Sequence, residues 1–297
     1  MKNTYISFLF TSPPPEERVY DAVAVCSGRY DIPHFPTIPG LPTYTGHYIH
    51  SKEYADASPF LNQHVLLVGA HASGMDLLLD LAKSGVKVDV SHRRPEPISG
   101  LPEEAEQYPE PIEFEDDLVY FKGCEEGYKF DTIIFATGYE TSLGFLDPAC
   151  MLETDVLPRP LYRYTLNPQY PTMAIFNQAV KIAPVLFSEY QALYFRDVLL
   201  GKIELGTSEK LTKEANDIVM ERDDRPLKYR YQLDLEQFEV NKYFANSCKV
   251  PLEGQHNMDA LCEFYDRVGK DRARNPSQYR DREYTFCDKS ETFILLK

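Results

Sequence analysis

The segment from Gly69 to Gly74 has the residue types and spacing of a turn that binds a dinucleotide. It reads Gly-Ala-His-Ala-Ser-Gly. In such a turn the first glycine allows a sharp bend, the third allows close helix–strand packing, and the pyrophosphate rests on the helix N-terminus. His71 stands where the middle glycine would let the backbone approach the pyrophosphate. We predict that Gly69, His71, Ser73 and Gly74 bind a dinucleotide; a purely structural turn is the alternative.

A second candidate site follows at Ser91-His92-Arg93-Arg94. Sites that prefer NAD place Asp or Glu here, to bind the ribose 2′-hydroxyl. This chain has a hydroxyl group and two guanidinium groups instead, and the planar fork of arginine matches a phosphate with two N–H donors. We predict that Ser91, Arg93 and Arg94 bind the 2′-phosphate of NADP(H). The alternative is a solvated charge pair on a turn.

The elements that must position these residues form a βαβ unit. Residues 64–68 are an apolar strand, residues 75–84 are a Leu-rich helix stopped by Gly85, and residues 86–90 are a second strand. A strand, a glycine turn, a helix and a strand within about thirty residues indicate such a unit. It places the glycine turn at the helix N-terminus and the arginines just after the second strand.

Two segments share an aspartate, an apolar strand and a glycine at equal spacing: Asp21–Gly28 and Asp131–Gly138. Buried parallel strands of any function can end this way. We favour two copies of the strand that closes a nucleotide-binding sheet, whose terminal glycine lets the backbone pass close to a ligand.

A third motif runs from Tyr44 to Tyr54. It resembles the identifying motif of flavin-containing monooxygenases, F-x-G-x-x-x-H-x-x-x-F/Y, with Tyr44 in place of the leading Phe and with Gly46, His50 and Tyr54 matching. Ser73–Asp76 also agrees with the family, as do Phe135–Tyr139, similar to F-A-T-G-Y, and Ser188–Gln191, similar to E-x-Q. The resemblance covers residues 18–222. We expect His50 to serve the fold and the domain geometry rather than catalysis.

The resemblance implies an α/β fold class with nested Rossmann-like dinucleotide-binding folds, a two-dinucleotide-binding flavoprotein with a helical C-terminal part. In the family NADPH passes hydride to FAD, and a flavin C4a-hydroperoxide formed with O₂ oxygenates a soft nucleophilic N or S atom of a small-molecule amine or sulfur substrate. The cofactors carry this chemistry, and no catalytic residue emerges from the sequence.

Members of this family open with a strand and a G-x-G-x-x-G turn for FAD, whereas the first glycine here is Gly28. We therefore expect a truncated member that lacks the first FAD βαβ unit and binds FAD poorly, so that its activity is impaired. The expected remnants of the FAD site are Ser27, Gly28, Thr137, Gly138 and Gln191. The alternative is a non-catalytic NADP-binding or interaction protein derived from such an enzyme. A disulfide reductase is disfavoured because the chain has no CxxC.

Composition narrows the class of protein further. The formal charge of −15 disfavours nucleic acid as a partner, because such binders need a basic face. The six cysteines have no CxxC or zinc-ligand spacing, so we expect no metal and reduced, mostly buried thiols. No apolar window is long enough for a transmembrane segment. We expect a cytoplasmic protein and leave its oligomeric state open.

The predicted domains are a disordered lead-in at 1–17, a remnant of the FAD domain with the interdomain connection at 18–60, the NADP-binding domain at 61–140, a return to the FAD domain at 141–222 and a C-terminal helical extension at 223–297. Ser188–Gln191 is predicted to be a capping box before a helix at 192–200 that Gly201 stops, with further helices at 208–222 and 258–269. The acid-rich segment 113–117 is expected to be a solvated loop.

Overall fold

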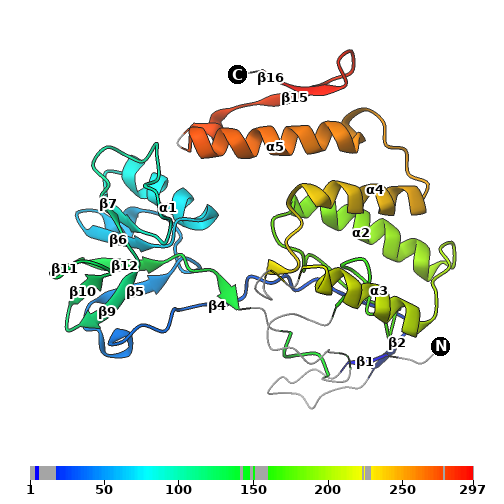
Figure 1. Cartoon of the computed structure of the whole chain (residues 1–297), viewed down its shortest axis with the longest axis horizontal. Helices are drawn as coiled ribbons and strands as arrows, with labels where there is room; N and C mark the ends of the chain where they lie inside the picture. The colour runs from blue at the N-terminus through cyan, green and yellow to red at the C-terminus, as the bar shows by residue number, and fades with distance from the viewer. Residues whose placement is uncertain are drawn as a thin grey trace. The chain divides into compact units, whose positions relative to one another are not determined.

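The structure is a computed structural model that describes residues 4–6, 18–140, 143–147, 150, 160–222, 224, 229–276 and 278–296 (Figure 1). The chain divides into two compact units. Unit 1 contains Met1–Ile32, Glu140–Arg267 and Glu283–Lys297, and unit 2 contains Pro33–Tyr139 and Val268–Arg282. Each unit is described by itself.

Unit 2 is built on a parallel sheet of five strands in the order β5-β12-β6-β7-β8. Its strands are β5 (His47–His50), β12 (Thr132–Phe135), β6 (His64–Val68), β7 (Lys87–Ser91) and β8 (Gln107–Tyr108). The central strands read as continuous apolar runs because both faces of the sheet are covered.

Successive residues of β6 point to opposite faces of the sheet, and each face has its own hydrophobic cluster. Val65 and Leu67 pack with Leu78 and Leu81 of helix α1 (Ala72–Lys83). Leu66 and Val68 face the other cluster, which includes Phe114, Val119, Phe121 and Phe130. Phe114, Val119 and Phe121 lie on an antiparallel sheet of β11 (Gly127–Lys129), β10 (Leu118–Phe121) and β9 (Pro111–Glu115).

The predicted βαβ unit is confirmed, with small shifts of its boundaries. β6 spans the predicted residues, and β7 lies one residue later than predicted. Helix α1 begins at Ala72, three residues before the predicted start, so Ser73 and Gly74 belong to the helix rather than to the turn. Gly85 follows the helix in the left-handed conformation, at φ 80°, where glycine carries no steric cost.

Unit 1 combines helices with short strand pairs. Its helices are α2 (Pro184–Leu199), α3 (Ser208–Met220) and α4 (Gln237–Ser247), and α5 (Met258–Arg274) begins in it. Strand β3 (Val23–Val25) pairs in parallel with β14 (Met173–Ile175), β1 (Thr4–Ile6) pairs with β2 (Arg18–Tyr20), and β15 (Tyr284–Cys287) pairs with β16 (Thr292–Leu295). Unit 1 also contains the 3-10 helices η5 (Asp234–Glu236) and η6 (Gly254–His256), whereas η1 (Leu41–Thr43), η2 (Ser58–Phe60) and η7 (Tyr279–Asp281) belong to unit 2. Strand β4 (Ile32–Pro33) pairs with β13 (Tyr139–Glu140).

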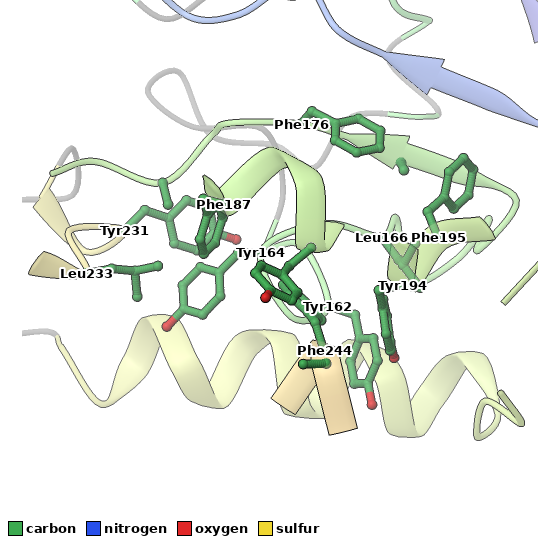
Figure 2. Packing of buried hydrophobic residues seen from close by; sticks show 14 of the residues in the cluster. Tyr162, Tyr164, Leu166, Phe176, Phe187, Tyr194, Phe195, Tyr231, Leu233 and Phe244 are labelled. Atoms are coloured by element: carbon green, nitrogen blue, oxygen red, sulfur yellow. The ribbon is translucent and has the colours of Figure 1, made fainter. Parts of the chain in front are cut away.

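The core of unit 1 is rich in aromatic side chains, as Figure 2 shows. Tyr194 and Phe187 of α2 face Phe244 of α4, and the Tyr194 and Phe244 ring centroids are 4.8 Å apart. Aromatic residues bury large apolar areas. The tyrosines of this cluster therefore contribute to the core of unit 1.

Several expectations need correction. The capping box is wrong: α2 begins at Pro184, whose fixed φ suits the first helical position, and Ser188 lies inside the helix, where its hydroxyl donates to the Pro184 carbonyl. Gly201 does follow the end of α2, at φ 68°. Helix α5 extends five residues beyond the predicted Gly269, and the C-terminal region also contains the β15–β16 hairpin.

Three further corrections concern loops and thiols. The acid-rich segment is not a loop, because Glu113–Glu115 belong to β9 and only Asp116 and Asp117 form the turn to β10. Residues 4–6 of the expected disordered lead-in form β1, while 1–3 and 7–17 lie outside the described residues. The six cysteines are unpaired, but Cys26 is exposed and the other five are half-buried rather than buried.

Candidate functional site

The glycine turn at the carboxyl end of β6 is shaped by two residues that cannot carry a side chain. Gly69 has φ 112°, and a Cβ atom placed on it would lie 2.5 Å from the Ala136 carbonyl oxygen. A Cβ atom on Gly74 would lie 1.8 Å from the Gly69 carbonyl oxygen. The two glycines therefore let α1 start directly against β6 and the end of β12, which is the packing predicted for the first and third positions.

The N-terminus of α1 opens at this turn. His71 is the N-cap residue, no side chain caps the helix, and the first intrahelical bond runs from Met75 N to His71 O. The amides of Ala72, Ser73 and Gly74 precede that bond, so they are the groups a helix N-terminus offers to an anion. His71 has φ −87° and ψ −163°, which any residue adopts, so the backbone accepts a histidine at the middle position.

The arginine loop is bonded to the glycine turn. The Arg94 Nη2 atom donates to the Ala70 carbonyl oxygen at 3.1 Å. The Gly69 amide donates to the Ser91 carbonyl oxygen at 2.9 Å, which ties the end of β7 to the same turn. The two segments singled out in the sequence thus meet at one end of the parallel sheet, where such folds bind ligands.

Hydrogen bonds hold the arginine loop in shape. The Arg94 amide donates to His92 Nδ1 at 3.2 Å, which leaves the proton on Nε2 to be donated to Gln107 Oε1 at 3.0 Å. The Gln107 side chain also accepts from the Ile98 amide at 2.8 Å and donates to the Ile98 carbonyl at 3.0 Å. Sequence reasoning missed this role of Gln107 and His92, because their contact depends on how β8 pairs with β7.

A cavity of about 380 Å³ lies beside the arginines. Its charged groups are Arg93, Arg94, Lys122 and Glu110, and Lys122 Nζ is 3.0 Å from Glu110 Oε1. Because that pair neutralises itself, the two exposed guanidinium groups dominate the charge of the cavity. Its remaining lining residues are His92, Pro95, Pro97, Gln107, Tyr108 and Pro109.

Ser91 is placed differently from the arginines. Its side chain is 1% exposed, and its hydroxyl donates to the Pro109 carbonyl at 2.6 Å. Its proton is therefore used inside the protein, and this geometry does not offer the hydroxyl to a ligand. Ser91 instead positions the turn, through its carbonyl group.

The motif residues Gly46, His50 and Tyr54 all make contacts inside unit 2. His50 is fully buried: its Nδ1 accepts from the Lys52 amide at 3.1 Å and its Nε2 donates to the Gly138 carbonyl at 2.9 Å, so the ring is neutral with its proton on Nε2. Burial lowers the pKa of His50. The ring thus joins the ends of β5 and β12.

The other two motif residues also pack locally. A Cβ atom on Gly46 would lie 2.4 Å from the Tyr44 ring, so this position requires glycine for the ring to close over it. Tyr54 stacks on Phe60 and donates to Asp80 Oδ2 of α1 at 2.6 Å. The motif therefore supports the sheet that carries the glycine turn.

The residues expected to remain from a FAD site fall into both units. After β3, Ser27 is exposed and Gly28 is half-buried, with Gly28 at φ 72°. Thr137 and Gly138 follow β12 in unit 2, and Gly138 has φ 86°. Both members of the sequence echo thus end parallel strands in a left-handed glycine.

Gln191 serves the core of unit 1. It is fully buried, its amide donates to the Tyr164 carbonyl and to Thr165 Oγ1 at 3.0 Å each, and it accepts from the Asn177 amide at 3.2 Å. These partners use its hydrogen-bonding groups within the protein. The described residues include no cluster of His, Cys, Asp or Glu side chains suited to a metal ion. Among the helices they form, none has the length and apolar character to cross a bilayer.

Comparison with known proteins agrees with this geometry. A family model described as flavin-binding monooxygenase-like matches residues 13–110. The chain is 30% identical to flavin-containing monooxygenase FMO GS-OX-like 7 of Arabidopsis thaliana, over 94% of the chain and 62% of the relative. It is 32% identical to FMO GS-OX3 of the same organism, over 68% of the chain and 45% of the relative. The chain therefore spans between 45% and 62% of the length of these two curated relatives.

Solved structures have the same fold. The structure of S-allyl-L-cysteine S-oxygenase from Allium sativum is 25% identical with a TM-score of 0.80, and the match covers 96% of this chain and 65% of the S-oxygenase chain. Tmm from Pelagibacter sp. strain HTCC7211 is 20% identical with a TM-score of 0.79, and the match covers 94% of this chain and 62% of the Tmm chain. The predicted α/β fold class with Rossmann-like dinucleotide-binding folds is confirmed. The chain belongs to the flavin-containing monooxygenase family.

Proposed function

We propose that unit 2 binds NADP(H), and that the protein is an NADPH- and FAD-dependent monooxygenase that oxygenates soft nucleophilic N or S atoms of small molecules. One observation carries the proposal: the Arg94 guanidinium group is bonded to the Ala70 carbonyl at the glycine turn. This contact brings groups suited to a pyrophosphate and groups suited to a 2′-phosphate to one end of the sheet.

Each part of this site has a distinct task. The amides of Ala72, Ser73 and Gly74 bind the pyrophosphate at the N-terminus of α1, with the helix dipole adding to the attraction. Gly69 and Gly74 keep side chains out of the turn so that the helix lies close to the strand. Arg93 and Arg94, exposed beside the cavity, bind the 2′-phosphate with paired N–H donors.

The proposed reaction consumes one NADPH, one proton and one O₂ for each substrate molecule. One oxygen atom forms the new bond to sulfur or nitrogen, the other leaves as water, and NADPH is oxidised to NADP⁺ by two electrons. Bound nicotinamide and flavin supply the electron transfer and the activation of O₂. A thioether is the favoured substrate class, because the similar protein from Allium sativum is an S-oxygenase of S-allyl-L-cysteine.

Dinucleotide affinity tests the site. Arg93→Ala and Arg94→Ala should each weaken NADPH binding at least about tenfold, because a hydrogen bond between charged groups contributes about 1.5–3 kcal/mol. NADH binding should change little with Arg93→Ala, because NADH lacks the 2′-phosphate. Titration of the NADPH fluorescence measures both affinities.

The matched control is Lys87→Ala. Lys87 is exposed at the other end of β7, so this change removes one positive charge without touching the cavity. It should leave both affinities unchanged. Equal losses of NADPH and NADH affinity in Arg93→Ala would contradict the 2′-phosphate role.

A non-catalytic NADP-binding protein is the second candidate, and His71 favours it, because an imidazole in place of glycine adds bulk beside the pyrophosphate. The two candidates differ in flavin and in turnover. The purified protein is incubated with FAD, desalted and examined by visible absorption, then supplied with NADPH, O₂ and methyl p-tolyl sulfide. Flavin absorption and sulfoxide formation support the monooxygenase; NADPH binding with neither supports the second candidate.

A further inference from the structure

The end of α5 and the 3-10 helix that follows it belong to unit 2. This C-terminal segment, Asp271–Arg282, is folded on itself by Asp271 Oδ1, which lies 2.7 Å from Arg282 Nη1 and accepts from Asn275 Nδ2 at 2.9 Å. Pro276 is buried, and a Cβ atom on Gly100 would lie 2.9 Å from its Cδ atom. The segment therefore packs against the loop that follows the two arginines.

A second attachment of the C-terminal segment is at the dinucleotide helix. Arg280 binds Asp76 of α1 through two parallel hydrogen bonds, Nε to Oδ1 at 3.1 Å and Nη2 to Oδ2 at 2.5 Å. The two residues are 204 positions apart in the sequence. The bond to Asp76 raises the pKa of Arg280, so the guanidinium group stays charged at any working pH.

Asp76 stands close to the end of α1 that receives a ligand. It follows Gly74 by two residues, and the first turn of the helix has no acidic residue. Helical side chains lean toward the N-terminus and cover the preceding turn, and the rise from Ala72 to Asp76 is about 6 Å along the axis. The Asp76 carboxylate thus lies within about one Debye length of a pyrophosphate at the helix N-terminus, where like charges repel.

We propose that Arg280 is a positioning residue for the dinucleotide: it neutralises the Asp76 carboxylate beside the pyrophosphate site and fixes the C-terminal segment against the nucleotide-binding fold. This inference rests on the proposed binding of NADP(H) to unit 2. An ion pair this exposed, with the Arg280 side chain at 63% and the Asp76 side chain at 35%, contributes little to folding stability. Its effect therefore appears in ligand affinity.

The test uses the full chain and measures the dissociation constants of NADPH and NADH at 20 mM and 500 mM NaCl, with thermal unfolding by circular dichroism. Arg280→Gln leaves the Asp76 charge unpaired and should weaken both nucleotides by about threefold to tenfold at low salt, with a smaller loss at high salt because the repulsion is screened. The unfolding temperature should change little. Both nucleotides respond because they share the pyrophosphate.

Two further variants isolate the charge. Asp76→Asn/Arg280→Gln removes the repulsive carboxylate and should restore wild-type affinity. Arg274→Gln is the matched control, because Arg274 is an exposed arginine of the same C-terminal segment and the ion pair with Asp76 is made by Arg280. It should change neither affinity.

The outcomes separate the two proposals. Wild-type protein that does not bind NADPH overturns the proposed function and this inference with it. If the wild type binds NADPH but Arg280→Gln binds as tightly at low salt, or if the double variant stays as weak as Arg280→Gln, the inference fails and the proposed function stands. A loss confined to NADPH would also refute it, since that would place Arg280 at the 2′-phosphate.

Discussion

Gly74→Ala is the sharpest test of the packing that forms the dinucleotide turn. The added Cβ would lie 1.8 Å from the Gly69 carbonyl oxygen, whereas ordinary contacts begin at 3.4 Å. The obstacle is backbone, so α1 must move away from β6 by about 1.6 Å, an overpacking that costs about 3 kcal/mol. Alanine gains about 1 kcal/mol of helix propensity over glycine. The net loss of unfolding free energy should be about 2 kcal/mol.

Gly269→Ala is the matched control. Gly269 is also helical and exposed, and a Cβ atom placed on it meets nothing within 4 Å. The same chemical change should therefore stabilise the protein by about 0.5–1 kcal/mol, the propensity gain alone.

Amide hydrogen exchange of β6 and β7 measures the effect within unit 2, which avoids assuming that both units unfold together. In Gly74→Ala these strands should exchange faster, by about thirtyfold for 2 kcal/mol, and NADPH affinity should fall because the helix N-terminus moves. Equal protection in Gly74→Ala and wild type, or stabilisation of the kind expected for Gly269→Ala, would refute the packing account.

Two other perturbations have defined outcomes. Burial lowers the pKa of His50, so below pH about 6.5 the unfolded state binds more protons than the folded state, and stability falls on acidification. His50→Gln should therefore reduce the difference between the urea midpoints measured at pH 7.5 and pH 5.5. An unchanged difference would contradict the assignment of this pH dependence to His50. Gln191→Leu leaves the Tyr164 carbonyl and the Asn177 amide without a partner, while the Thr165 hydroxyl keeps its bond to the Arg163 carbonyl, so the unfolding free energy should fall by about 3 kcal/mol. A wild-type melting temperature would show that these bonds do not contribute to stability.

The sequence predicted best where local chemistry decides the structure. β6 is a short apolar run with turn residues beside it, and it has the predicted bounds. The start of α1 was misplaced because Gly74 was assigned to the turn, whereas its missing side chain serves the first turn of the helix. The start of α2 was misplaced because Ser188 and Gln191 fit a capping pattern, while Pro184 was the signal that mattered.

The rest depends on contacts between distant segments. The sequence placed Arg94 after a strand but could not show its bond to Ala70. It gave Ser91 a ligand role, whereas pairing of β8 beside β7 brings the Pro109 carbonyl to its hydroxyl. No local pattern indicates that Arg280 meets Asp76. The cofactor-binding roles of the site residues stay predictions until binding is measured.

The order of strands in unit 2 also determines which strands can pair first while the chain is being synthesised. β12 lies between β5 and β6, so β5 has no neighbour in the sheet until residues 132–135 exist. The chain between His50 and Thr132 is roughly 80 residues long, which a ribosome adds in roughly 4–16 s at 5–20 residues per second. During that interval β6 and β7 can already pair, while the nascent β5 stays exposed to chaperones and proteases.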